Sequence, residues 1–133
     1  MTNFVFFDLE TRSNVDLRNA GVHPYAYDPS TEILCLAAHF PDGRTGVWAP
    51  EHRRLDLDCD EWVLDAFNEH VDAGSFFIAW NSHFDRHMLW SCGEKAGIHC
   101  PELKQVLCAQ TLAESYNLPG GLGKAGDVLG VPV

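Results

Sequence analysis

The sequence predicts an α/β domain built around a mixed β-sheet. Three short apolar segments near the N-terminus are joined by short turns, which is typical of antiparallel strands. Further along the chain, segments with helical and strand periodicity alternate, as they do where helices connect parallel strands. With 133 residues and 46% hydrophobic content, the chain has the size and apolar content of a single domain with one core.

The N-terminal half contains the three strands that we expect to be antiparallel. The first covers residues 4–9 and is apolar at successive positions, which predicts a central strand covered on both faces. A polar segment follows, and its glycine and prolines favour turns. The second strand is expected at residues 33–40. A turn at 41–43 then leads into a third strand at 45–48.

The C-terminal half alternates between helices and strands. Segment 55–74 has an apolar stripe with helical spacing, Asp58 and Glu61 resemble a capping box, and Gly74 suits the C-terminal cap. Five further elements follow the same reasoning. They are a strand at 76–80, a helix at 82–92, a short strand at 105–108 with a helix at 109–116, and a last short helix at 122–129.

The composition limits the possible functions. A net charge of −10 disfavours a general nucleic-acid clamp, because such proteins carry a basic stripe that displaces counterions. The same charge permits a nuclease that binds few nucleotides through divalent metals held by carboxylates. The sequence has neither a long apolar run nor a basic leader segment, so we expect an intracellular protein with no membrane partner. Its five cysteines are odd in number and lack CxxC spacing, which predicts buried, reduced thiols.

Two acids stand at the end of the first strand. Asp8 and Glu10 are two residues apart, so in a strand their side chains leave the same face about 7 Å apart. Acids on a buried strand repel each other and lose hydration unless a cation balances them, which favours a metal site. The alternative is that the strand ends at Phe7 and leaves both acids in a solvated loop.

A third acid, Asp85, follows the predicted strand at 76–80. Ser82 could cap the next helix, and Asp85, three residues later, would then be the acid of a capping box. Asp85 also lies at the carboxyl end of a strand, where open α/β sheets place their sites. Both interpretations stay open on local grounds.

These residues carry a resemblance to a known family. FFDLETRS at 6–13 resembles the first motif, DxE, and AWNSHFDRHML at 79–89 resembles the second, NxxxD, of the DEDD (DnaQ-like) superfamily of 3′→5′ proofreading exonucleases. Segments 15–40 and 112–133 resemble parts of the exonuclease domains of phage-type family A DNA polymerases. The resemblance implies a ribonuclease H-like mixed sheet that lacks the final helix.

The resemblance also implies a mechanism. Asp8 would bridge two Mg²⁺ or Mn²⁺ ions, Glu10 would bind the ion that activates water, and Asp85 would support the other ion. Two such ions stabilise the attacking and leaving oxygens of an in-line displacement at phosphorus. The implied reaction is hydrolysis at the 3′ end of single-stranded or frayed DNA, which releases nucleoside 5′-monophosphates. The implied partner is a DNA polymerase domain or subunit.

Four residues are implied as substrate contacts. Thr11 and Asn81 have suitable positions beside the two motifs. Leu9 alternates to the face opposite the acids, which equally predicts a core residue, and Phe84 fits the apolar stripe of its helix.

The family pattern is incomplete in this sequence. A fourth acid is expected in a YxxxD or HxxxD motif on a final helix, and no such motif follows the second motif before Val133. We therefore expect one C-terminally incomplete domain, which could be a fragment, part of a split enzyme or a remnant that serves as a polymerase-associated interaction module. An oligoribonuclease-like enzyme acting on RNA shares both visible motifs and is the second enzymatic alternative.

Overall fold

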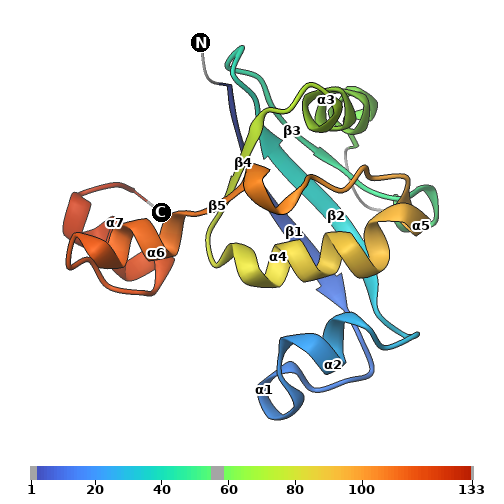
Figure 1. The fold of residues 1–133 in the computed structure, drawn as a ribbon, viewed down its shortest axis with the longest axis horizontal. Helices are drawn as coiled ribbons and strands as arrows, with labels where there is room; N and C mark the ends of the chain where they lie inside the picture. The colour runs from blue at the N-terminus through green and yellow to red at the C-terminus, as the bar shows by residue number, and fades with distance from the viewer. Residues whose placement is uncertain (1–2, 55–58, 133) are drawn as a thin grey trace.

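Five strands form one mixed sheet in the order β3-β2-β1-β4-β5 (Figure 1). The structure is a computed structural model that describes residues 3–54 and 59–132. Strands β1, β2 and β3 are antiparallel, whereas β4 and β5 run parallel to β1. The predicted mixed α/β fold class is confirmed, with a strand order compatible with a ribonuclease H-like sheet. The strands are β1 (Phe4–Arg12), β2 (Glu32–His39), β3 (Thr45–Trp48), β4 (Phe76–Ala79) and β5 (Val106–Cys108).

Strand β1 is longer than predicted. It pairs with β2 from Phe6, opposite His39, as far as Arg12, with a register shift between Glu10 and Thr11. Both acids of the first motif therefore lie within the strand, and the alternative in which they occupy a loop is wrong.

The helices agree largely with the predicted ones. The helix predicted at 82–92 is longer, because α4 continues through a π-helical turn into α5. Two short helices occupy the segment that was predicted to form turns. The helices are α1 (Leu17–Ala20), α2 (Val22–Ala26), α3 (Glu61–Asp72), α4 (Ser82–Met88), the π-helical turn Leu89–Gly93, α5 (Glu94–Ala96), α6 (Ala109–Ser115) and α7 (Leu122–Leu129), with 3₁₀ turns at Glu51–Arg53 and Leu103–Gln105.

The ends of α3 are partly as expected. Asp58 lies outside the described residues, so its predicted capping role is untested. Helix α3 begins after Asp60, whose carboxylate accepts a hydrogen bond of 3.1 Å from the backbone N–H of Val47. At the other end Gly74 has φ +81°, which confirms the predicted glycine cap.

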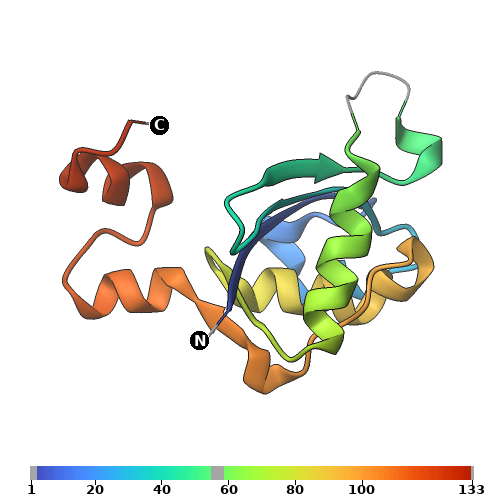
Figure 2. The same cartoon turned by 90° about the horizontal axis from the view of Figure 1, so that it is seen from above.

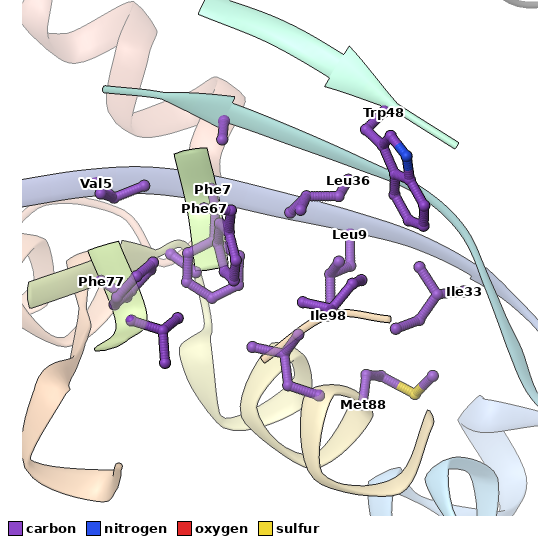
Figure 3. Packing of buried hydrophobic residues seen from close by; sticks show 14 of the residues in the cluster. Val5, Phe7, Leu9, Ile33, Leu36, Trp48, Phe67, Phe77, Met88 and Ile98 are labelled. Carbon is purple, nitrogen blue, oxygen red and sulfur yellow. The ribbon is translucent and has the colours of Figure 1, made fainter. Parts of the chain in front are cut away.

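The hydrophobic core occupies one face of the sheet. Val5, Phe7 and Leu9 of β1 lie in it together with buried residues of α3 and α4. Figure 3 shows Phe67 and Phe77 beside Phe7. The ring of Phe7 meets Phe67 of α3 edge-on at 5.7 Å and Phe77 of β4 at 6.0 Å. These contacts anchor the buried face of β1 against α3 and β4.

The opposite face of β1 is open, so the prediction of a strand covered on both sides is wrong. Phe4 and Phe6 are 40% and 49% exposed. The cause is that α3 and α4 both pack on the same face, while α6 and α7 lie beside the sheet (Figures 1 and 2). An unbroken apolar run does not distinguish this arrangement from burial on both faces.

All five cysteines are free thiols, as predicted. Only Cys92 is fully buried, and Cys100 is exposed, so the prediction that all are buried is wrong.

None of the described helices combines the length and apolar character needed to cross a membrane.

Candidate active site

The site lies where two parallel strands separate. Strands β1 and β4 are paired only as far as Phe6 opposite Ile78. Beyond this pair, Asn81 adopts a left-handed conformation with φ 56°, and α4 starts directly after it. The first turn of α4 brings Asp85 beside β1. In open α/β sheets this kind of gap at the carboxyl ends of strands is the usual place for a site.

Asp85 is a buried carboxylate with an unpaired oxygen. Its side chain is 2% exposed, and its Oδ1 has no hydrogen-bond partner among the described residues. Burial and the nearby charge of Asp8 raise the pKa of Asp85 to about 7, although hydrogen bonds from the backbone N–H groups of Leu9 and of Asp85 itself oppose this. A buried acid in this state is costly unless a proton or cation neutralises it.

The capping-box interpretation of Asp85 is wrong. The residue that caps α4 is Asn81, and it makes no side-chain capping bond. Ser82 is buried and forms a hydrogen bond to Cys108 instead. Asp85 nevertheless lies in the first turn of α4, near the positive end of the helix dipole, and accepts a hydrogen bond from its own backbone N–H.

Asp8 and Glu10 lie on the open face of β1, and both are exposed. Asp8 is close enough to Asp85 to raise the pKa of that acid. Glu10 is opposite Cys35 of β2; burial is the main cause that raises the pKa of the Cys35 thiol, and Glu10 and Asp8 add to it. Within residues 3–54 and 59–132, no three His, Cys, Asp or Glu side chains gather closely enough to hold a metal ion. The structure thus brings together Asp8 and Asp85, with Glu10 farther along the strand.

The donor set suits a hard divalent cation at the Asp8–Asp85 pair. Carboxylate oxygens are the ligands that Mg²⁺ prefers, and Asp85 Oδ1 has a free lone pair inside the protein. A cation here would neutralise the charges of both carboxylates and satisfy the unpaired oxygen. Glu10 is on the same face as Asp8, two residues along the strand, where its flexible side chain could join them.

Three of the four predicted substrate residues are exposed or half-buried, and the fourth is a core residue. Thr11 is half-buried and shares a hydrogen bond of 2.9 Å with the hydroxyl of Tyr25, and Asn81 is exposed at the start of α4. Phe84 is half-buried, with its ring 5.9 Å from that of Tyr25. Leu9 is 4% exposed in the core, on the face opposite the acids, which favours its structural role.

Two residues at this edge were missed from the sequence. Tyr25 of α2 links Thr11 to Phe84, and nothing in a short polar segment indicated it. Cys108 ends β5 beside Asp85; burial raises the pKa of its thiol, but hydrogen bonds from Thr111 and Ser82 outweigh burial and lower it to about 7. The end of a third parallel strand was the signal that could have identified Cys108.

Comparison with known proteins gives one structural likeness to report. No protein-family model matches the chain, and no curated protein does either. Among solved structures, the family B DNA polymerase from the hyperthermophilic archaeon Pyrobaculum calidifontis is similar over 74% of this chain, with 21% identity and a TM-score of 0.44. The matched region spans 12% of that polymerase chain, and at this identity and TM-score the likeness says nothing about activity.

Proposed function

We propose that the chain is the catalytic part of a metal-dependent 3′→5′ exonuclease that hydrolyses the 3′-terminal phosphodiester of single-stranded or frayed DNA. One observation carries the proposal. The buried carboxylate of Asp85, with an unpaired oxygen, lies near enough to Asp8 for their charges to interact, where two parallel strands diverge. The two backbone hydrogen bonds of Asp85 leave its Oδ1 without a partner among the described residues, whereas a bound cation would neutralise the buried charge and satisfy that oxygen.

The residues of the site have distinct roles in this proposal. Asp8 and Asp85 hold a Mg²⁺ or Mn²⁺ ion, and Glu10 completes the set for the second ion that the resemblance implies. When bound, these ions would polarise the scissile phosphate and lower the pKa of a water molecule. The backbone N–H of Leu9 orients Asp85 by a hydrogen bond.

Two residues beside the carboxylates would position the substrate. The hydroxyl of Thr11, oriented by Tyr25, and the exposed amide of Asn81 flank the acids and can contact the terminal nucleotide. The sequence resemblance supports these assignments.

The net charge of −10 fits a site that works through cations and has little affinity for duplex DNA. We propose that a DNA polymerase domain or subunit supplies that affinity, as the resemblance to polymerase exonuclease domains implies. Co-purification of the chain with a polymerase encoded in the same genome would test this part separately.

The direct test is hydrolysis of matched DNA and RNA oligonucleotides in Mn²⁺, together with calorimetry of Mn²⁺ binding. Asp8→Asn and Asp85→Asn should each lower the cleavage rate at least about 100-fold and abolish high-affinity Mn²⁺ binding, because each removes a metal ligand. Glu69→Gln, an exposed acid on α3, is the matched control and should change neither. Mn²⁺ binding that is unchanged in Asp8→Asn would refute the proposal. Faster cleavage of RNA than of DNA would reassign the substrate.

A further inference from the structure

The helices α2 and α4 carry a group of aromatic and cationic side chains that the proposed chemistry does not use. The group extends over the adjoining surfaces of the two helices and the turn that follows α4. We call it the α2–α4 strip. It consists of His23 and Tyr27 from α2 and its C-terminal cap, His83, Arg86 and His87 from α4, and Trp90 from the π-helical turn.

The rings of the strip form a continuous cluster. His83 lies 4.7 Å from His87, and His87 lies 5.4 Å from Trp90, measured between ring centroids. On the α2 side, His23 is 4.5 Å from Tyr27, whose hydroxyl is 3.2 Å from Nδ1 of His87. The strip is nevertheless open, because Tyr27 is 46% exposed and Trp90 is 42% exposed. Rings that served only to join the helices would be buried between them.

The strip contains one permanent cation. The guanidinium of Arg86 lies 5.1 Å from the ring centroid of Trp90, and its Nη2 donates to Nδ1 of His83 at 3.3 Å. Burial and the neighbouring His83, Arg86 and His23 lower the pKa of His87, which favours its neutral form. Arg86 is therefore the group of the strip that can pair with a phosphate in this acidic chain.

The strip begins on the helix that carries Asp85. His83 is two residues before Asp85, so the two side chains leave different sides of α4, and the distance from His83 to Trp90 along a helix is about 10 Å. This is roughly the length of three stacked nucleotides of one strand. Tyr25, on the same helix as His23, joins the strip to Thr11 beside the carboxylates.

We propose that the α2–α4 strip binds the nucleotides that precede the 3′ end of a single strand, with bases stacked on its rings and a phosphate paired with Arg86. This inference rests on the proposed exonuclease function, whose substrate it locates. Stacking on aromatic rings accepts any base, as an enzyme that shortens a strand of any sequence requires. The combination of rings with a guanidinium is the chemistry that recognises single-stranded nucleic acid.

The test measures binding without hydrolysis. Fluorescence anisotropy in EDTA would compare a fluorescein-labelled ten-nucleotide oligothymidylate with an abasic strand of the same length and charge. The variants are Trp90→Ala and His23→Ala, both at exposed positions, so that loss of folding does not confuse the result. The matched control is Arg44→Ala, because Arg44 forms a similar pair with Trp62, 4.3 Å from its ring centroid, outside the strip.

We expect the wild-type chain to bind oligothymidylate about tenfold or more tightly than the abasic strand, since one stacked base contributes this much. Trp90→Ala should remove most of that difference, His23→Ala should reduce it, and Arg44→Ala should leave it unchanged. Equal binding of both strands by the wild type, or equal loss in Arg44→Ala, would overturn the inference.

The two proposals fail in different ways. If Asp8→Asn still binds oligothymidylate through Trp90 while the wild type cleaves nothing in Mn²⁺, the strip stands and the proposed activity falls. If the wild type cleaves oligothymidylate and Trp90→Ala does so with the same KM, the activity stands and the strip falls.

Discussion

The two faces of β1 have opposite environments. Val5, Phe7 and Leu9 lie under α3 and α4, whereas Phe6 and Asp8 alternate with them on an open face. Because strand side chains alternate, neighbouring residues of one strand serve different purposes: one face anchors the sheet, and the other presents carboxylates. Substitutions one residue apart should therefore separate stability from chemistry.

The largest expected effect comes from adjacent phenylalanines. Phe7→Ala should lower the free energy of unfolding by about 3–5 kcal/mol, because it leaves a cavity between Phe67 and Phe77. Phe6→Ala, one residue earlier and 49% exposed, should change it by less than about 1 kcal/mol. Urea denaturation measures both values. Equal losses in the two variants would mean that the open face is covered in solution.

The next largest effect concerns the pH dependence of stability that Asp85 of α4 causes. Its folded-state pKa of about 7 is above the ordinary value of 3.8, so between these pH values the folded chain keeps a proton that the unfolded chain loses. Its contribution should therefore reduce stability as pH rises from about 4 to 7, by on the order of 1.4 kcal/mol per pH unit and roughly 4 kcal/mol at most. Above pH 7 the loss should level off.

Carboxylates with a lowered pKa make stability increase as pH rises. One of them is Glu32, whose pKa is lowered by His52 and Arg53 despite burial. The relevant quantity is therefore the difference in unfolding free energy between Asp85→Asn and the wild type, measured by urea denaturation at several pH values. As pH rises from 4 to 7, Asp85→Asn should become more stable relative to the wild type. Mg²⁺ at pH 8 should stabilise the wild type and leave Asp85→Asn unchanged. A difference that does not vary with pH would contradict the assigned charge state.

The comparison of the two faces also explains what the sequence could predict. The spacing of apolar residues in 33–48 and 122–129 predicted two strands and a helix. Their ends lie within one residue of those observed, because local periodicity determines these elements. Helices α1 and α2 were missed, since elements of four and five residues contain little more than one helical turn and Pro24 favoured a turn. The open face was missed because an apolar run does not indicate where distant helices pack.

The candidate site was predicted in parts. Two-residue spacing placed Asp8 and Glu10 on one face, which the structure confirms. The burial of Asp85 and its proximity to Asp8 depend on where β1 and β4 separate, and no local pattern encodes that point. The assignment of these residues to metal binding stays a prediction.

The thiols of Cys100 and Cys108 should differ in reactivity. Burial raises the pKa of Cys100 to about 11, although the residue is exposed overall, whereas hydrogen bonds from Thr111 and Ser82 outweigh burial and lower that of Cys108 to about 7. At pH 7 iodoacetamide should modify Cys108 roughly 100-fold faster, because the larger thiolate fraction exceeds the loss in nucleophilicity. Mass spectrometry of timed samples gives both rates. Faster modification of Cys100 would show that access, and not ionisation, governs reactivity at this edge of the sheet.

The smallest expected effect tests the link between the open face and α2. Removing the 2.9 Å hydrogen bond between Thr11 and Tyr25 should cost about 0.5–1.5 kcal/mol of stability in either Thr11→Val or Tyr25→Phe. The double variant should cost little more than one of them, since both lose the same bond. If Thr11 also contacts the terminal nucleotide, Thr11→Val should raise KM for an oligonucleotide more than Tyr25→Phe does, because only the former removes the hydroxyl beside the carboxylates. Equal KM values in the two variants would limit Thr11 to holding α2 in place.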